Sequence, residues 1–531
     1  MKNKSIPYCS TGYFSKLMCD YLTSKEELKP FYSILPSEES LLQLATEKGQ
    51  WFSQDKRDVL VKELQEQNKS LSLSALSEEN IKALEDSKTF TITTGHQLNI
   101  FTGPLYFFYK ILDVIQASKK LNEAQSERRF VPVFWMATED HDFEEINHFH
   151  FQSQKITWNS KQTGAVGRFS TEGLEEVAEQ VEILLGNGKN GMYLKKLFRN
   201  AYTKHDTLTS ATRYLVNELF GDLGLVIIDG DSKSLKQFFT PVVEAELEQQ
   251  KSHKEITQTT KGLIEAGYHE QVHPREINLF YLTDTDRLRI EKNENGFTLV
   301  DGNTNFTKTE LLEEVNKYPE RFSPNALLRP VYQEMVLPNV AYIGGGGELA
   351  YWLQLKDYFE SITVPFPALV LRTSMLLVNE KQKEKLDRLA ASVEVLFLNH
   401  SDLEANRANK LSELPVDFSE QKQHLEKQFA DLYVLAEKTD GSFVGAVAAQ
   451  ERKQIKGLEN LEKRLLRAQK RKYASEITRL TKIKKELFPQ DNLQERINNF
   501  SEFYLAYGEQ LIEKIAEETN PLEGAFKVIV L

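Results

Sequence analysis

Two patterns of hydrophobic and polar positions divide this chain. From residue 89 to about 375, short apolar and β-branched runs alternate with stretches of helical period. These runs predict strands at 89–93, 131–136, 225–229, 279–282, 288–290, 297–300, 340–343 and 364–371. Strands that alternate with helices are typical of an α/β sheet. Residues 1–88 are mostly helical in pattern and predict a covering layer.

Beyond residue 377 the strand pattern is replaced by leucine-rich helical sequence. Leu458, Leu461 and Leu465 recur at three- and four-residue steps, and residues 418–438 carry a second apolar seam. Gly441 lies near the expected reversal of the chain. This pattern predicts an antiparallel coiled-coil hairpin whose remaining apolar stripe forms a homodimer contact. A helical subdomain that packs only on its own core is the alternative.

The predicted domain organisation follows from this change of pattern. Residues 1–380 form an α/β catalytic core with insertions at about 150–220 and 255–325, and residues 381–500 form the helical coiled-coil domain. Residues 501–531 return to the core as a helix and a strand, because the chain ends on the apolar sequence GAFKVIVL.

Composition narrows the class of protein. The net charge of -12 argues against general nucleic-acid binding. No run reaches the roughly 18 apolar residues that a membrane span needs, and the first residues lack the apolar centre of a signal peptide. Cys9 and Cys19 are the only cysteines and build no disulfide framework. We therefore expect a cytoplasmic protein without a membrane partner.

The segment that is most informative about function is a predicted β-α-β unit at residues 89–142. Its first strand enters a glycine-punctuated turn, and its second strand ends at an acidic cluster. Open parallel sheets bind their ligands at the carboxyl ends of the strands, and these ionisable groups lie at such an end. The candidate catalytic residues are His96, Gln97, Glu139, Asp140 and Asp142, and the candidate binding residues of this unit are Thr94, Gly95, Thr102, Gly103 and His141.

The acidic cluster has other interpretations. With His148 and His150 it has ligand chemistry suited to zinc or manganese, although the spacing matches no known metal motif, and we predict no metal. Paired carboxylates also serve glycoside hydrolases. Purely structural capping and ion pairing is a further alternative.

A second segment, residues 322–355, contains four consecutive glycines between a predicted strand and a helix beginning near Glu348. Such a run favours close approach of a ligand to the backbone. An ion pair between Arg329 and Glu334 would explain those two residues without a ligand. The candidate binding residues here are Arg329, Gln333, Glu334, Gly344, Gly345, Gly346, Gly347, Glu348 and Tyr351, followed at the next strand end by Arg372 and Ser374.

Several of these segments resemble one family. The sequences STGYFSKL, TGHQLNIFTGPLYFFYK, VPVFWMATEDHDFEEINH, RPVYQEMVLPNVAYIGGGGELAYWLQL and LFPQDNLQERINNF are similar to the cysteine ligases of bacillithiol biosynthesis, the BshC family. The resemblance implies a Rossmann-like, nucleotidyltransferase-type core with connecting insertions and a coiled-coil domain that mediates dimers. It also implies that L-cysteine is joined to the amine of glucosaminyl malate in the last step of making this thiol.

Amide formation from a free carboxylate is uphill in water, so the reaction needs an activated cysteinyl carboxylate. ATP, with Mg²⁺, is the candidate source, with phosphate oxygens near the turn after the first strand and His96 or Gln97 donating hydrogen bonds. The acidic residues would bind the cysteine ammonium or deprotonate the attacking amine, and Arg329 or Arg372 would hold malate carboxylates.

The sequence does not decide whether a nucleotide is used, because the HIGH, KMSKS and phosphate-loop signatures are absent. A G-x-G-x-x-G match begins at Gly186, but it follows a helical pattern rather than the strand that a dinucleotide-binding motif requires. The alternative function is a class I synthetase-like RNA- or tRNA-binding module in which the basic residues 452–485 contact phosphates.

Overall fold

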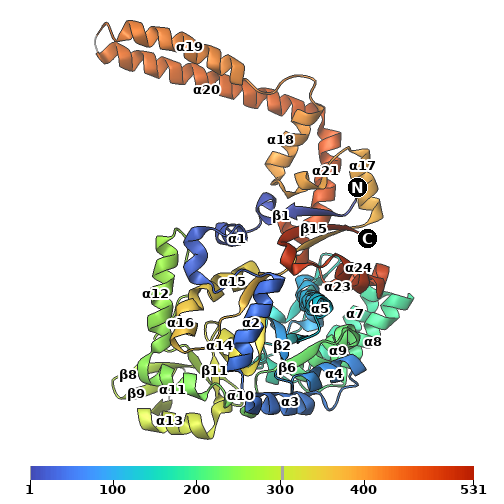
Figure 1. The fold of residues 1–531 in the computed structure, drawn as a ribbon. Helices are drawn as coiled ribbons and strands as arrows, with labels where there is room; N and C mark the ends of the chain where they lie inside the picture. Colours follow the sequence, from blue (N-terminus) through green and yellow to red (C-terminus); the bar gives the residue numbers. More distant parts are fainter. Residues whose placement is uncertain (1, 301–303, 440) are drawn as a thin grey trace. The chain divides into compact units, whose positions relative to one another are not determined.

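The computed structural model describes residues 2–300, 304–439 and 441–531 (Figure 1). These residues form two compact units. The larger contains residues 3–376, 493–529 and 531, and the smaller contains residues 2, 377–492 and 530. Within the described ranges, every helix is too short or too polar to span a membrane.

The larger unit is built on a five-stranded sheet in which each strand is parallel to its neighbours. In spatial order the strands are β13 (Ala368–Leu371), β12 (Asn339–Gly344), β2 (Thr89–His96), β3 (Arg129–Met136) and β6 (Val226–Asp229). Nearly all of their residues are buried, as expected for a parallel sheet covered on both faces. The buried hydroxyl of Thr93 in β2 donates to Asn339 Oδ1 of β12 at 2.8 Å.

The strand order contains one switch point. From β2 the chain proceeds outwards through β3 to β6, and it then returns to the other side of β2 as β12 and β13. In such doubly wound sheets a crevice opens at the carboxyl ends of the two strands where the direction changes. Here those strands are β2 and β12.

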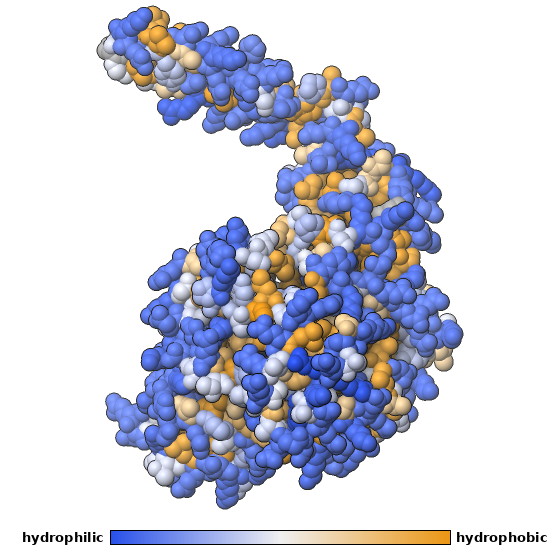
Figure 2. Space-filling view, viewed as in Figure 1, coloured by the Kyte–Doolittle hydropathy of each residue, from blue (hydrophilic) through white to orange (hydrophobic). Residues whose placement is uncertain are grey.

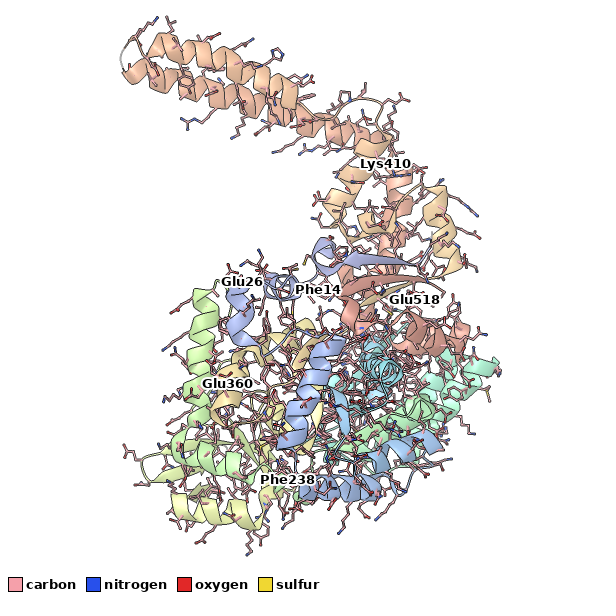
Figure 3. All side chains as sticks on the ribbon, viewed as in Figure 1. Phe14, Glu26, Phe238, Glu360, Lys410 and Glu518 are labelled. Carbon is pink, nitrogen blue, oxygen red and sulfur yellow. The ribbon has the colours of Figure 1, made fainter. Side chains whose placement is uncertain are left out.

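Helices surround this sheet, and side chains fill the space between the layers (Figure 3). The helix α5 packs on β2 and β3, α2 packs on β12, and α3 and α4 pack on β6. The helices before β6 are α1 (Lys16–Leu22), α2 (Glu38–Trp51), α3 (Gln54–Asn68), α4 (Ala75–Ala83), α5 (Tyr106–Ala124), α6 (Phe143–Ile146), α7 (Leu174–Leu185), α8 (Lys189–Thr203) and α9 (Leu208–Phe220). Those after β6 are α10 (Lys233–Lys236), α11 (Thr240–Gln249), α12 (Lys251–Glu265), α14 (Arg329–Val336), α15 (Gly346–Trp352), α16 (Lys356–Ser361), α22 (Gln494–Ile497), α23 (Phe500–Tyr507) and α24 (Gln510–Glu518).

An antiparallel sheet is inserted between β6 and β12, and we call it the inserted sheet. Its order is β10 (Thr304–Phe306), β9 (Gly296–Leu299), β8 (Arg287–Asn293), β7 (Leu279–Leu282) and β11 (Phe322–Pro324), with α13 (Lys308–Lys317) between β10 and β11. A hairpin of β4 (His148–Phe151) and β5 (Gln154–Thr157) follows β3. Near the chain ends, β1 (Lys4–Pro7) pairs antiparallel with β15 (Ala525–Val530).

The smaller unit is helical after β14 (Met375–Val378), the strand at which the division falls. Its helices are α17 (Glu380–Arg388), α18 (His400–Leu411), α19 (Ser419–Ala436), α20 (Gly441–Lys472) and α21 (Ala474–Leu487). The helices α19 and α20 lie side by side around buried Phe429, Ala436 and Val447. Most of the surface of this pair is hydrophilic (Figure 2). Hydrophobic groups are visible near the end of the pair at which α19 ends and α20 begins.

The predicted strands and the helical hairpin are present, with local corrections. The strand predicted at 364–371 is wrong in its first half and begins at Ala368, because Pro365 and Pro367 lack the N–H groups that a ladder needs. The helix expected near Glu348 begins two residues earlier, at Gly346. The strands β1, β4, β5, β10, β11 and β14 lie outside the predicted runs.

Candidate active site

A cavity of about 630 Å³ lies at the carboxyl ends of β2, β3 and β12. Its location matches the switch point of the sheet, and the inserted sheet contributes to its wall. Ten of the residues predicted from the sequence line it, namely Gly95, His96, Gln97, Glu139, Asp140, His141, Asp142, Arg329, Glu348 and Tyr351. Residues from positions 95 to 351 of the chain therefore meet at one cavity, as the parallel topology requires.

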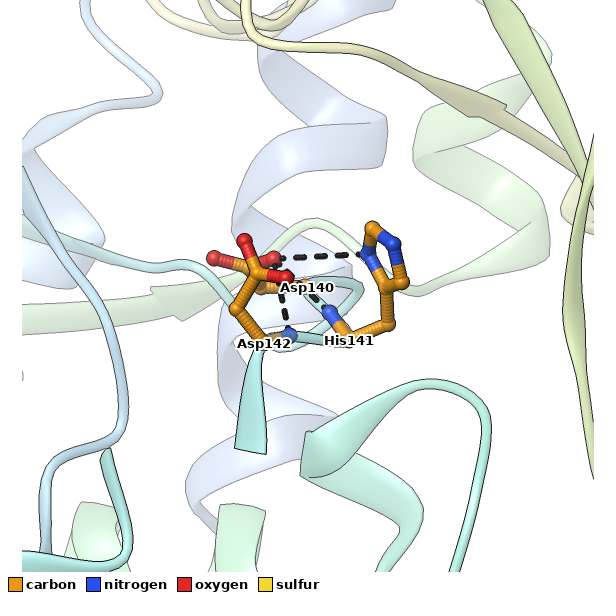
Figure 4. Close-up of side chains that lie close together, drawn as sticks. All are labelled: Asp140, His141 and Asp142. Carbon is orange, nitrogen blue, oxygen red and sulfur yellow. Dashed lines mark hydrogen bonds and ion pairs between the residues drawn. The ribbon is translucent and has the colours of Figure 1, made fainter. Parts of the chain in front are cut away.

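The acidic loop, residues 138–142, directly follows β3 and forms one wall. The Asp140 carboxylate accepts a hydrogen bond from the Gln97 side chain at 2.8 Å. It also accepts one from the His141 backbone N–H at 2.7 Å (Figure 4). Burial alone would raise the pKa of the Asp140 carboxyl, but these hydrogen bonds and the nearby Arg287 charge hold it below its ordinary value. Asp140 therefore stays ionised and is a poor proton acceptor.

The other two carboxylates of the acidic loop differ in their partners. Glu139 forms an ion pair with Lys236, whose side chain is completely buried. Burial raises the pKa of the Glu139 carboxyl, and Lys236 opposes that shift. Asp142 is exposed, and no side chain in the described parts of the chain bonds to its carboxylate. Asp142 is thus the carboxylate of this loop that remains available to a ligand.

His96 ends β2 between the rings of Tyr106 and Phe107, with ring centroids 5.4 and 5.3 Å away. Burial, reinforced by the Lys110 charge, lowers the pKa of His96 to about 3. The imidazole is therefore neutral near pH 7. Its buried Nε2 atom has no hydrogen-bond partner among the described residues, although the ring lines the cavity. Such an atom is costly unless a ligand or water satisfies it.

The floor of the cavity contains an ion pair that the sequence did not suggest. Lys110 of α5 lies 2.8 Å from Glu348 Oε1, and the hydroxyl of Tyr342 donates to Glu348 Oε2 at 2.6 Å. Burial alone would raise the pKa of Glu348, but Lys110 and the hydrogen bonds lower it to about 2. A side chain at Gly95 would approach Arg329 Nη1 to 3.3 Å, so glycine there leaves room for the guanidinium. Arg329 Nη1 bonds to Gln333, whereas the buried Nη2 has no hydrogen-bond partner within the described ranges.

Several predicted residues lie outside the cavity lining. The Thr94 hydroxyl donates to the Ile343 carbonyl at 2.7 Å and ties β2 to β12. Thr102 and Gly103 both have positive φ in a tight turn, and a side chain at Gly103 would lie 2.5 Å from Asn99. These three residues shape the backbone around the site.

The alternative interpretation, an ion pair between Arg329 and Glu334, is wrong. Glu334 is fully buried and pairs with Lys48 of α2 at 3.0 Å, and it also accepts hydrogen bonds from Gln333 and Asn339. Arg329 instead faces the cavity. Sequence could not reveal the pair because Lys48 lies 286 positions away.

Arg372 and Ser374 are also engaged within the protein. The Arg372 guanidinium bonds to Glu495 at 2.6 Å and to the Ser374 hydroxyl at 3.1 Å, with its side chain only 5% exposed. The glycines 344–347 do not line the cavity either. The Glu348 carboxylate caps the Gly345 N–H at 3.1 Å, and a side chain at Gly346 would lie 3.0 Å from Met18. The close approach at Gly344, Gly345 and Gly346 is therefore made by the protein's own side chains.

Sequence inspection missed the basic residues that the inserted sheet and its preceding loop contribute. Arg287 and Arg275 line the cavity, and no local motif or periodicity marks either one. Asp140, His141 and Asp142 offer possible metal ligand atoms within 4.8 Å of one another. However, Arg287 Nη1 lies 3.0 Å from His141 Nδ1 and 3.9 Å from Asp140 Oδ1. A fixed cation already occupies that side, so we assign no metal to this cluster.

Comparison with known proteins defines the class to which this architecture belongs. A family model described as "Bacillithiol biosynthesis BshC, N-terminal Rossmann-like domain" matches residues 1–373, and one described as "Bacillithiol biosynthesis BshC, C-terminal coiled-coil domain" matches residues 375–531. The fold is therefore that of a Rossmann-like enzyme with a coiled-coil domain. The chain belongs to the bacillithiol biosynthesis BshC family.

Relatives in several bacteria are similar in sequence to this chain over nearly its full length. "Putative cysteine ligase BshC" of Christiangramia forsetii is 49% identical over 100% of this chain and 99% of its own length. The protein of the same name from Flavobacterium johnsoniae is 48% identical over 100% of both chains, and that of Bacillus cereus strain AH187 is 29% identical over 97% and 98%. The predictions of family, fold class and a ligase enzyme are confirmed, and the RNA-binding alternative is not favoured.

Proposed function

We propose that this ligase joins the carboxyl group of L-cysteine to the amine of glucosaminyl malate, as the final step of bacillithiol synthesis in the cytoplasm. The reaction forms one C–N bond and removes the carboxylate oxygen as water or on an activating group. The names of the relatives support cysteine as a substrate. The chemistry of amide formation supports prior activation, for which ATP with Mg²⁺ is the candidate.

The observation that carries the proposal is the opposite charge of the two sides of the cavity. The acidic loop presents Asp142, whose carboxylate has no hydrogen-bond partner in the part of the chain that the structure describes, while Arg275 and Arg329 present guanidinium groups on other parts of the lining. Ammonium and amine groups are suited to the first side, and carboxylates to the second. A cysteine and an amino sugar bearing malate contain both kinds of group.

Within this arrangement each residue has a distinct proposed role. Asp142 accepts a proton from the attacking amine, because Asp140 and Glu139 are held by internal partners. The neutral His96 donates from Nε2 to an oxygen that gains negative charge. Arg329 and Arg275 hold malate carboxylates, and the Lys110–Glu348 pair keeps the floor of the cavity rigid.

The test is direct synthesis with purified protein. L-cysteine and glucosaminyl malate are incubated with each nucleoside triphosphate in turn, and the thiols are identified by mass spectrometry. We expect the amide product with at least one nucleotide and its loss in Asp142→Asn. The exposed neighbour Glu144, changed to Gln, is the matched control and should retain activity. Absence of the product under every condition would refute the proposal.

A homodimer formed through α19 and α20 is part of the same proposal. Leu432, Val434, Leu435 and Phe443 are large apolar residues that are 41 to 57% exposed near the end of this hairpin. Exposed apolar groups clustered in this way are typical of protein interfaces. Light scattering after gel filtration should give a dimer for the wild type and a monomer for Leu435→Glu. The nearby exposed Lys438→Glu should remain dimeric, and a wild-type monomer would contradict the proposed contact.

A further inference from the structure

The inserted sheet places one arginine beside the acidic loop. Arg287 is the first residue of β8, and its side chain is only 8% exposed. Its Cζ atom lies 4.2 Å from the centre of the Phe280 ring in β7. From β11, Ser323 Oγ accepts from Nε at 3.2 Å and the Pro324 carbonyl accepts from Nη2 at 2.7 Å. Three strands of the inserted sheet therefore fix the direction of this guanidinium.

The remaining nitrogen of Arg287 points at the acidic loop. Its Nη1 lies 3.0 Å from His141 Nδ1, which is hydrogen-bond distance, and 3.9 Å from Asp140 Oδ1, which is not. The distance from His141 Nδ1 to Asp140 Oδ1 is 3.7 Å, also too long for a hydrogen bond (Figure 4). The close polar contact of the His141 ring is therefore the one to Arg287.

This contact determines where the imidazole carries its proton. A guanidinium has only N–H donors, so the nitrogen that it contacts must act as an acceptor. His141 Nδ1 is consequently unprotonated, and the ring proton lies on Nε2. The side chain of His141 is 42% exposed and lines the cavity, and no partner for Nε2 is present in the described parts of the chain.

We propose that Arg287 is a positioning residue that fixes His141 as the neutral Nε2–H tautomer, so that His141 donates a hydrogen bond to an oxyanion of the substrate. The proposed role of this cavity in the ligase reaction is assumed. Two sources of the oxyanion share this chemistry, namely a malate carboxylate and a nucleotide phosphate. Arg275, which also lines the cavity, adds positive charge for an anion. His141 then belongs with the binding residues rather than with the proton acceptors.

The tautomer can be read without any substrate. Protein labelled with ¹⁵N-histidine is examined by long-range ¹H–¹⁵N correlation near pH 7.5, and the His141 signals are identified by their loss in His141→Asn. We expect an unprotonated Nδ1 and a protonated Nε2 in the wild type and in Arg287→Lys, which retains a donor and a charge. In Arg287→Met the two tautomers should mix. A protonated Nδ1 in the wild type would overturn the proposal.

Kinetic and binding measurements then test the consequence. Loss of a hydrogen bond to a charged group should raise KM about ten- to hundredfold, while kcat changes little because the contact is present in the ground state as well. A rise for glucosaminyl malate identifies the carboxylate, and a rise for the nucleotide identifies the phosphate. Arg287→Lys should recover most of the loss, and unchanged KM values for both ligands in Arg287→Met would contradict the role.

The design separates this inference from the proposed function. If the wild type makes no amide product, the proposed reaction fails while the tautomer result still stands. If Arg287→Met does not fold, the wild-type spectrum and the Arg287→Lys variant still decide where the proton lies.

Discussion

Two clusters of charged residues lie within the larger unit, and their contacts differ. Around the cavity, Asp142, His141 and Arg275 keep polar side-chain atoms that have no hydrogen-bond partner among the described residues. Behind the cavity, the pairs Lys48–Glu334 and Arg372–Glu495 are buried and satisfied within the protein. We therefore propose ligand contacts only for those charged residues near strand ends whose polar atoms remain available after folding. The predictions below test this distinction.

The largest expected effect is on catalysis. Changing Asp142 to Asn removes the proposed proton acceptor without removing a side-chain hydrogen bond to any described residue, so the rate should fall about 10²- to 10⁴-fold. The melting temperature should stay close to that of the wild type. Steady-state kinetics with the mass-spectrometric assay measures the rate, and a variant with full activity would place the acceptor elsewhere.

The buried pairs should affect stability instead. Lys48→Met leaves Glu334 buried without its cation, which should cost about 3–5 kcal/mol of unfolding free energy. Lys29→Met is the matched control, because it breaks only an exposed pair with Glu26, which should contribute little to stability. Urea unfolding compares the two variants. Equal losses would show that burial does not distinguish these clusters.

Sequence predicted the fold better than the site. Strands such as 131–136 and the hairpin seams carry local periodicity, so their pattern alone indicates them. Glu334 and Arg372 looked like ligand contacts because each is a charge in a motif-rich segment, but their partners lie far away in sequence. Arg287 was missed because no local pattern marks it. It reaches the acidic loop only through the fold of the inserted sheet.

A smaller effect should appear in the pH dependence of stability. The pKa of His96 is lowered to about 3 in the folded chain, below the value of about 6.5 in the unfolded chain. Between these values only the unfolded state gains a proton, so stability falls as pH falls below about 6.5 and is unaffected by His96 above it. From pH 7 to pH 5 the wild type should lose about 2 kcal/mol more than His96→Gln in urea unfolding. Equal losses would mean that His96 titrates normally.

The smallest effect is expected at the glycines. A side chain at Gly347 meets no atom within 4 Å, and the residue has no positive φ. Gly347→Ala should therefore be neutral or stabilise the protein by less than about 1 kcal/mol. KM for every substrate should be unchanged. An increased KM would restore the interpretation that a ligand approaches this backbone.

The central claim is that glucosaminyl malate binds in the cavity at the switch point. Its most direct test is calorimetric titration of that compound into the wild type and into Arg275→Gln, with the exposed Arg388→Gln as control. We predict binding to the wild type and to the control, and an affinity at least about tenfold weaker for Arg275→Gln. Equal affinities for all three proteins, or no binding to the wild type, would contradict the account.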